Sequence, residues 1–395
     1  MTIGILGGGQ LGYMLALAGY PLGLHFRFLD PSPEAPVGRI ATRITAPFTD
    51  RSALAKFAAG LELVTYEFEN VPVETARFLA ERVPVLPPPA ALEVAQDRLN
   101  EKRLFQQLGI ATTEFAAVAD GVALAGAIKH IGLPAILKTC RMGYDGKGQW
   151  SLRNAEDADR ARSELTAANL AAKDGKDGAP EHAGFILERL VPFTRELSIL
   201  AVRGRTGETA VYPLVENHHR GGILRLSLAP APQLDRAVQQ GAEDAARRIF
   251  DALNYVGVLA IEFFEYEGRL LANEIAPRVH NSGHWTIEGA ITSQFENHLR
   301  AVVGLPLGST HAVGCSVMLN LIGDVPNSAE VLTVRDAHLH LYGKSARAGR
   351  KLGHVTLRAS SPEQLASRLG ELPSYFHRPE FGLDAVLRHS ASARR

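Results

Sequence analysis

Short apolar runs alternate with amphipathic stretches over the first hundred residues. Strands are expected at 3–6, 26–29 and 61–65, and helices at 11–17 and 52–59. Strands that alternate with helices in this way form a parallel sheet covered by helices. The segment therefore predicts an α/β domain.

The pattern changes after Leu86, where three consecutive prolines predict a stiff connection. A single helix is expected over 90–108. Further along, a hairpin is expected at 257–264 and 270–275, turning around Gly268. The remaining strands are expected at 135–138, 149–152, 185–187, 197–202 and 210–215, and the remaining helices at 155–170 and 236–253. The last part of the chain is expected to form short strands and loops.

Composition narrows the class of protein. The 395 residues exceed a single typical core, so two or three domains are expected. Basic and acidic residues number 42 each, which argues against a nucleic-acid surface. Two distant cysteines, Cys140 and Cys315, predict a reducing cytoplasm. Residues 1–24 carry no charge, but they lack a basic start and contain three consecutive glycines, so neither a targeting segment nor a membrane span is expected.

The sequence Gly7-Gly-Gly-Gln-Leu-Gly12 follows the first expected strand and matches the G-x-G-x-x-G fingerprint. Asp30 lies near the end of the second strand, as in dinucleotide-binding units. Glycines let backbone N–H groups approach an anion at a helix N-terminus, so any phosphate would satisfy the motif. Three interpretations stay open: a nicotinamide cofactor, a phosphorylated substrate, or a tight turn without a ligand.

A second glycine motif, Gly143-Tyr-Asp-Gly-Lys-Gly-Gln149, lies between two expected strands. Lys138 ends the strand before it, where its ammonium can reach a phosphate. The glycines allow the backbone to fold over a triphosphate, although the spacing and the following strand differ from a Walker A loop. A long polar hairpin tip is the alternative.

Glu262 and Glu274 lie equally far from Gly268 in the expected hairpin. With a three-residue turn they would face each other, which destabilises a ladder unless a cation lies between them. Mg²⁺ binds carboxylates together with phosphate oxygens and water. With a two-residue turn the two glutamates would lie on opposite faces, and both geometries stay open.

Polar residues follow the hairpin directly, in Arg278-Val-His280-Asn-Ser-Gly-His284. Loops that leave core strands commonly carry sites. The Arg278 guanidinium suits a planar carboxylate-like anion through two parallel hydrogen bonds, with a structural ion pair as the alternative. The spacing of His280 and His284 suggests zinc, but the hard carboxylates nearby favour magnesium.

Four cations lie close together near the end of the chain: Lys344, Arg347, Arg350 and Lys351. Such cations repel one another unless an anion gathers them. The stretch therefore predicts a phosphate site or, as the alternative, a solvated basic loop.

Further segments complete the pattern: Thr65-Tyr-Glu67-Phe-Glu69-Asn-Val71, Gln96-Asp-Arg98, Glu188-Arg-Leu-Val191, Glu216-Asn-His-His219, Asn273-Glu-Ile-Ala-Pro-Arg-Val-His-Asn-Ser-Gly-His-Trp-Thr286, and Tyr342-Gly-Lys344 with Gly349-Arg-Lys-Leu-Gly-His354. With the two glycine motifs, they resemble the N5-carboxyaminoimidazole ribonucleotide synthetases, which are ATP-grasp enzymes of purine biosynthesis. The resemblance follows family order over nearly the whole chain. The block that begins at Asn273 is highly specific, whereas the first glycine motif alone is weak.

The resemblance implies an α/β and α+β multidomain protein. An N-terminal Rossmann-like pre-ATP-grasp domain would cover 1–100, a central ATP-grasp fold 101–305 with a flexible lid at about 112–185, and a small C-terminal domain 306–395. The protein would be a cytoplasmic, homodimeric ligase that binds ATP and Mg²⁺ and carboxylates 5-aminoimidazole ribonucleotide with bicarbonate, through carboxyphosphate. A sister ligase that uses formate and an NAD-dependent dehydrogenase are the alternatives.

The family's roles carry over position by position. The ATP site would contain Arg98, Lys138, Gly143, Tyr144, Asp145, Gly146, Lys147, Gly148, Gln149, Glu188, Arg189, Leu190, Val191, Glu196, His219, Asn273 and Glu274. The substrate site would contain Gly8, Gly9, Gln10, Leu11, Glu67, Tyr144, Asp145, Lys344 and Arg350. The metal ligands would be Glu262 and Glu274, and the catalytic residues Arg278, Lys138, Asp145 and His280. Many ATP-grasp enzymes have an asparagine two residues after the second metal glutamate, where this chain has Ala276.

Overall fold

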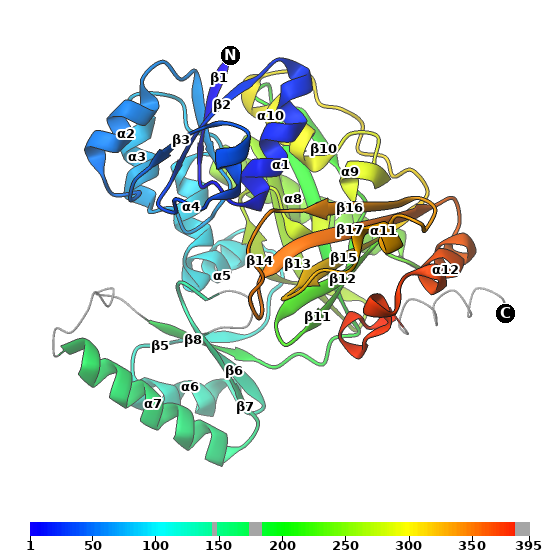
Figure 1. Ribbon diagram of the computed structural model, residues 1–395. Helices are drawn as coiled ribbons and strands as arrows, with labels where there is room; N and C mark the ends of the chain where they lie inside the picture. Colours follow the sequence, from blue (N-terminus) through cyan, green and yellow to red (C-terminus); the bar gives the residue numbers. More distant parts are fainter. Residues whose placement is uncertain (144–147, 174–183, 384–395) are drawn as a thin grey trace.

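The computed structural model of the protein describes residues 1–143, 148–173 and 184–383, and these residues form three sheets. An N-terminal α/β unit lies against a large antiparallel sheet, and a smaller unit projects from them at the lower left of Figure 1. The part of the second glycine motif at 144–147 lies outside the described residues.

The N-terminal unit contains a four-stranded parallel sheet, as the alternating pattern predicts. Its strands, in the order β3-β2-β1-β4, are Thr2–Leu6 (β1), His25–Asp30 (β2), Thr42–Thr45 (β3) and Leu63–Tyr66 (β4), and its helices are Gln10–Gly19 (α1), Arg51–Ala58 (α2) and Val73–Ala80 (α3). The chain leaves β1 where the strand order reverses, which is where open α/β sheets bind ligands. Strand β3 was not predicted, because its residues are exposed or half-exposed and form no apolar run.

The single helix expected over 90–108 is wrong, because the chain forms two helices, Pro89–Ala95 (α4) and Arg98–Gln107 (α5). Asp97 separates them with an extended φ of −133°. Its side chain accepts hydrogen bonds from the backbone N–H groups of Leu99 and Asn100, at 3.0 and 3.3 Å. An aspartate in this position caps a new helix, so α5 begins at Arg98.

The projecting unit is a four-stranded antiparallel sheet with two helices on one face (Figure 1). Its strands, in the order β5-β8-β6-β7, are Phe115–Val118 (β5), Ala135–Thr139 (β6), Gln149–Leu152 (β7) and Phe185–Arg189 (β8), and its helices are Gly121–Ile131 (α6) and Ala155–Lys173 (α7). Leu124, Leu137 and Leu165 contribute to a separate core. The strands expected here are confirmed, whereas β5 and α6 were not predicted.

The large sheet has nine strands in the described residues, and β10 lies off its main path, paired with β9. In the order β14-β13-β9-β11-β12-β15-β17-β16, its main strands pair antiparallel. Their bounds are Arg195–Arg203 (β9), Thr209–Val211 (β10), Val215–Arg220 (β11), Ile223–Ala229 (β12), Gly257–Tyr266 (β13), Arg269–Ala276 (β14), Cys315–Ile322 (β15), Ala337–Leu341 (β16) and Lys351–Ala359 (β17). The accompanying helices are Arg236–Leu253 (α8), Thr286–Gly289 (α9), Gln294–Val303 (α10), Ser328–Val331 (α11) and Pro362–Glu371 (α12). Because β12 pairs with β15, the C-terminal strands extend the central sheet.

The strand expected over 210–215 is wrong in one respect, because β10 and β11 divide it. Pro213 lies between these strands and has no N–H to donate to a ladder. The helix expected over 236–253 coincides with α8, and the hairpin of β13 and β14 turns at Gly268 as predicted.

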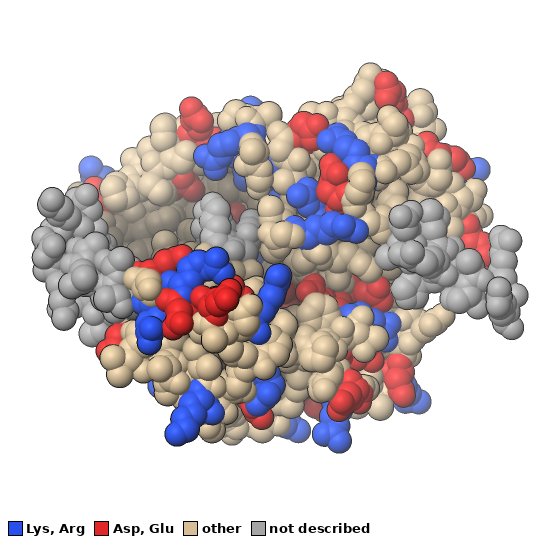
Figure 2. Space-filling model, turned by 90° about the horizontal axis from the view of Figure 1, so that it is seen from below, with Lys and Arg blue, Asp and Glu red and all other residues tan. Residues whose placement is uncertain are grey.

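Acidic and basic side chains intermix over the face of the molecule seen in Figure 2. This agrees with the formal net charge of zero and gives that face no field of a single sign. In the described part of the chain, no helix is both long enough and apolar enough to cross a membrane.

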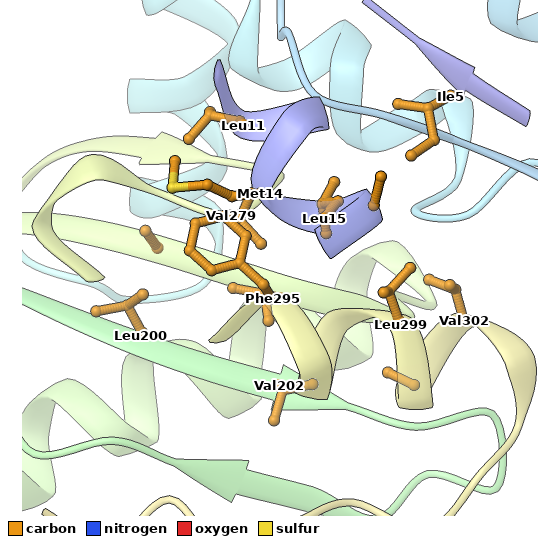
Figure 3. Close-up of a cluster of buried hydrophobic side chains, with 14 of the residues drawn as sticks. Ile5, Leu11, Met14, Leu15, Leu200, Val202, Val279, Phe295, Leu299 and Val302 are labelled. Carbon is orange, nitrogen blue, oxygen red and sulfur yellow. The ribbon is translucent and has the colours of Figure 1, made fainter. Parts of the chain in front are cut away.

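One hydrophobic cluster joins the N-terminal unit to the central sheet (Figure 3). Met14 and Leu15 of α1 pack with Phe295 and Leu299 of α10, which cover Leu200 on β9. These side chains are nearly or fully buried. The two parts therefore share apolar surface, and the loop after β1 is fixed relative to the central hairpin.

Phe295→Ala is expected to destabilise the protein by about 3–5 kcal/mol, because it removes a ring from the middle of this cluster. The measurement is the free energy of unfolding from denaturant titration. Val122→Ala, at a side chain that is 84% exposed on α6, is the control and should change stability by less than about 0.5 kcal/mol. Equal stability of the two variants would show that the cluster does not join the two parts.

Candidate active site

The hairpin of β13 and β14 places two glutamates directly opposite each other. Its turn has two residues, Glu267 and Gly268, both with positive φ, which is the shorter of the two turns that the sequence left open. A two-residue turn alone would put the glutamates on opposite faces. However, a β-bulge at Asn273 adds one residue to β14 and restores the register, so that Glu262 pairs with Glu274.

A cavity of about 530 Å³ lies over this hairpin, between the three sheets. The predicted site residues that line it are Gln10, Leu11, Arg98, Lys138, Gly143, Gln149, Glu196, His219, Glu262, Asn273, Glu274, Arg278 and His280. Others lie outside its lining: Gly8, Gly9, Glu67, Gly148, Glu188, Arg189, Leu190, Val191, Lys344 and Arg350. Tyr144, Asp145, Gly146 and Lys147 lie outside the described residues. A second cavity, of about 800 Å³, meets the first at Glu196 and His219.

The two opposed carboxylates have different surroundings. Burial and the neighbouring Glu274 carboxylate raise the pKa of Glu262 to about 7. Burial also acts to raise the pKa of Glu274, but Arg98, whose Nη1 lies 3.0 Å from Glu274 Oε2, outweighs it and lowers this pKa. The side-chain oxygen of Asn273, in the bulge, is buried and has no hydrogen-bond partner among the described residues.

These oxygen donors suit a hard divalent cation such as Mg²⁺, which would relieve the repulsion between the carboxylates. In the described part of the chain, no group of three or more His, Cys, Asp or Glu side chains has metal-binding geometry. A cation here would therefore complete its coordination with phosphate oxygens and water. The zinc hypothesis finds no support, since His284 is buried against Phe295 and His354.

Glu188 is buried between two lysines. Its Oε1 lies 3.0 Å from Lys138 Nζ, and its Oε2 lies 3.5 Å from Lys102 Nζ. Burial opposes the charged form, but the two ammonium groups outweigh it and lower the pKa of Glu188 to about 2. No signal in the sequence marks Lys102, because a Glu-Lys pair inside an amphipathic helix is usually solvated.

Glu196 and His219 form a second pair on the cavity wall. Glu196 Oε2 contacts His219 Nδ1. Burial would lower the pKa of His219, but the hydrogen bond to Glu196 outweighs it and raises this pKa. When it is protonated, the ring adds positive charge close to Glu262 and Glu274.

The first glycine motif binds carboxylates of the chain itself. Glu67 accepts hydrogen bonds from the backbone N–H groups of Gly9, Leu11 and Gly12, at 2.6, 3.1 and 3.0 Å. Asp30 accepts one from Gly8 N–H at 2.6 Å. A Cβ at Gly9 would lie 2.6 Å from Glu67 Oε1, so the glycine permits the approach of this carboxylate. Since these donors are occupied, the geometry favours the tight turn over a phosphate-binding loop.

The loop after β14 combines an ion pair with a neutral histidine. Arg278 Nε donates to Glu69, which lies in the segment after β4 and had no predicted role. The backbone N–H of Ser282 donates to His280 Nδ1 at 3.3 Å, so the proton of the neutral ring is on Nε2, 3.5 Å from Glu262 Oε1. Burial and the nearby Arg278 lower the pKa of His280 to about 3.

The C-terminal cations have different partners, although burial, together with the charges of Arg350, Lys351 and Arg347, lowers the pKa of Lys344. Lys344 Nζ contacts Gln10 Oε1 at the start of α1, which lies 334 residues earlier in the chain. Arg350 Nη1 instead donates to Ser345 Oγ at 2.8 Å. Lys351 lines the cavity. The C-terminal strands therefore meet the start of the chain beside the glycine motif.

Comparisons with known proteins match this arrangement. Models of the ribonucleotide synthetase preATP-grasp domain, the ATP-grasp domain and the phosphoribosylaminoimidazole carboxylase C-terminal domain match residues 1–96, 103–295 and 316–368. N5-carboxyaminoimidazole ribonucleotide synthase from Pseudomonas aeruginosa is 53% identical over 372 residues, which cover 94% of this chain and 98% of that protein. The chain belongs to the N5-carboxyaminoimidazole ribonucleotide synthase family.

Solved structures of this family have the same fold. The Thermus thermophilus synthetase is 59% identical and has a TM-score of 0.86, with coverage of 93% of this chain and 97% of that one. The Aspergillus clavatus synthase in complex with ADP and 5-aminoimidazole ribonucleotide is 29% identical and has a TM-score of 0.83, with coverage of 98% of both chains. The predicted fold class and the assignment as an ATP-grasp ligase are thus confirmed. The predicted domain boundaries stay predictions.

Gly9→Ala is expected to destabilise the protein by about 1–3 kcal/mol, because the added methyl group would overlap the Glu67 carboxylate. The backbone itself tolerates alanine, since Gly9 has a φ of −75°. Gly126→Ala is the control, because a Cβ there meets nothing within 4 Å on α6, and this change should stabilise by about 0.5–1 kcal/mol. Denaturant titration of both variants tests whether the Glu67 carboxylate leaves room only for glycine at position 9.

Proposed function

We propose that this chain carboxylates the amine of 5-aminoimidazole ribonucleotide with ATP and bicarbonate, and forms N5-carboxyaminoimidazole ribonucleotide, ADP and phosphate. The observation that carries the proposal is the cavity in which two opposed carboxylates meet Arg98, Lys138 and Arg278. The family membership supports it, as does the relative that was solved with ADP and 5-aminoimidazole ribonucleotide. Relatives have also been solved with ATP and with ADP.

The nucleotide is proposed to lie between the projecting unit and the hairpin. Lys138 and Arg98 face the cavity and suit the phosphates, together with the loop from Gly143 to Gln149. Glu196 and His219 suit the ribose. Because the carboxylate of Glu188 is already paired with lysines, we assign the adenine edge to the backbone of residues 188–191.

Glu262, Glu274 and the amide oxygen of Asn273 would hold Mg²⁺. Bound there, Mg²⁺ would neutralise charge on the phosphates and on the phosphoryl group in transfer. Many ATP-grasp enzymes have an asparagine at the position of Ala276, and the buried amide oxygen of Asn273 would serve as an oxygen ligand in its place. Arg98 and Lys138 supply fixed positive charge from the protein itself, close to where negative charge develops.

The substrate is proposed to bind on the side of the N-terminal unit. Lys344 and Gln10, which contact each other, suit its phosphate, and Arg350 is close along the chain. The backbone of the first glycine motif is occupied by Glu67, which makes Gln10 and Leu11 the parts of that loop that face the cavity. Tyr144 and Asp145 are assigned to this site on the family resemblance.

Bicarbonate must be activated, because its carbon carries an anionic oxygen and is a poor electrophile. Its oxygen attacks the γ-phosphorus of ATP and gives carboxyphosphate and ADP, and Arg278 can hold the planar anion through its guanidinium. Carboxyphosphate then releases CO₂ and phosphate beside the amine, which adds to CO₂ and loses a proton. Water must be excluded, since it would hydrolyse the intermediate, and a glycine loop that closes over the site suits this need.

The contacts of His280 argue against it as the acceptor of the amine proton, which leaves Asp145 as the candidate from the family resemblance. His280 Nδ1 already accepts the hydrogen bond of Ser282, and its Nε2 carries the ring proton. A dehydrogenase loses support as well, since the N–H groups of the dinucleotide fingerprint bind Glu67 and Asp30. A cytoplasmic location and a homodimer are also proposed, on the free cysteines and the family resemblance.

ATP hydrolysis by the purified protein is expected to require bicarbonate, 5-aminoimidazole ribonucleotide and Mg²⁺. Glu274→Ala should slow this turnover by about 100-fold or more, because it removes one of the opposed carboxylates. The assay follows ADP release with each component omitted in turn. Turnover with formate in place of bicarbonate would instead identify the sister ligase and overturn the proposal.

Lys344→Ala is expected to raise the Michaelis constant for 5-aminoimidazole ribonucleotide about tenfold or more, because a charge-assisted contact contributes about 1.5–3 kcal/mol. The affinity for ADP with Mg²⁺ should stay within about twofold of wild type, since Lys344 lies outside the cavity lining. Lys129→Ala, on the exposed side of α6, is the matched control. Loss of ADP affinity with an unchanged Michaelis constant would move this lysine to the nucleotide site.

A further inference from the structure

Lys102 is a lysine without exposed surface in the interior of the protein. It lies on α5, and its side chain is 0% exposed. Its Nζ lies 3.0 Å from Thr112 Oγ1, 3.2 Å from Ala272 O and 3.5 Å from Glu188 Oε2. Lys102 is not among the described residues that line the cavity over the hairpin. A buried ammonium is costly unless it is paired and hydrogen-bonded. The three oxygen atoms around Lys102 Nζ provide these partners.

The three partners of Lys102 belong to three different parts of the site. Glu188 lies on β8 of the projecting unit, and Thr112 lies in the segment that enters this unit. Ala272 lies on β14, next to the bulge at Asn273. Thr112 Oγ1 also donates to Ala272 O at 2.7 Å, so the Lys102 ammonium links the segment that enters the projecting unit to the strand that carries Glu274.

Lys102 also changes the charge that Lys138 presents to the cavity. Glu188 binds Lys102 through Oε2 and Lys138 through Oε1. Two ammonium groups around one carboxylate leave a net positive charge, and of the two lysines Lys138 lines the cavity. Without Lys102, Glu188 would neutralise Lys138 alone, and the attraction for an anion in the cavity would fall.

We propose that Lys102 is a positioning residue for the nucleotide phosphates. It engages Glu188 so that Lys138 keeps positive charge for the nucleotide. The proposal rests on the nucleotide site proposed above. It goes beyond that site because Lys102 acts through Glu188 without touching the ligand.

Lys102→Met keeps an unbranched side chain and removes the charge. Its affinity for ADP with Mg²⁺, measured by calorimetry, should fall about tenfold or more, because the phosphates lose a charge-assisted attraction. The Michaelis constant for 5-aminoimidazole ribonucleotide should stay within about twofold of wild type, since that site is separate. Lys102→Gln, which retains an N–H donor for Ala272 O, should show the same loss and serves if Lys102→Met does not fold.

Glu188→Gln provides the second test, because a neutral partner cannot neutralise Lys138. In that background Lys102→Met should change ADP affinity by less than about twofold, as expected for two residues that act through each other. Arg203→Met is the matched control. It also replaces a cation that is paired with a carboxylate, because Arg203 on β9 lies 3.2 Å from Asp251, but it lies outside the cavity lining and should leave ADP affinity unchanged.

The outcomes separate this inference from the proposed function. If the wild-type protein binds ADP and Lys102→Met and Lys102→Gln bind it equally well, Lys102 has no positioning role. An equal loss from Lys102→Met in the wild-type and Glu188→Gln backgrounds would show that Lys102 does not act through the carboxylate. Failure of the wild-type protein to bind ADP would instead overturn the nucleotide site itself.

Discussion

Two carboxylates held opposite each other on one hairpin are the constraint around which the site is built. Glu262 and Glu274 repel each other in partial burial, as the raised pKa of Glu262 reflects. The hairpin keeps them together because the bulge at Asn273 fixes their register, and the neighbouring strands hold the hairpin in a nine-stranded sheet. Other elements supply positive charge to this region: Arg98 lies at the start of α5, and His219 lies on β11. Each cation requires its own element to pack correctly, so the fold and the site depend on each other.

The first glycine motif shows that a fingerprint specifies a backbone shape and leaves the ligand open. Its N–H groups point to an anion at the start of α1, as the physics of helix termini predicts. The anion is the carboxylate of Glu67, which directly follows β4, the strand paired with β1. The helix N-terminus is thereby fixed to the neighbouring strand, and Gln10 is left facing Lys344 from the C-terminal part of the chain. The glycines thus fix the start of α1 through hydrogen bonds to Glu67 and Asp30.

Local pattern predicted part of the structure, and the features that depend on distant partners were missed. The strand and helix alternation, the helix of α8 and the hairpin around Gly268 follow from periodicity and turn residues. The break at Asp97 was missed, although an aspartate that caps a new helix is a local feature of the sequence. The opposition of the two glutamates needed the bulge, which no local signal marks. Family resemblance supplied most of the site, whereas Lys102 looked like a solvated helix residue and gained its role from β8 and β14.

The pairing of charges suggests how a buried polar cavity stays stable while it handles a highly charged ligand. Arg98 is paired with Glu274 and Lys138 with Glu188, so both of these cations on the cavity wall have a carboxylate partner. A nucleotide with Mg²⁺ would exchange these partners: its phosphates would take the cations, and the metal would take Glu274. Because breaking one half of a buried pair alone is costly, the exchange favours a ligand that brings both charges. The site would therefore discriminate against a free nucleotide and against a free metal ion by the same balance that keeps it folded.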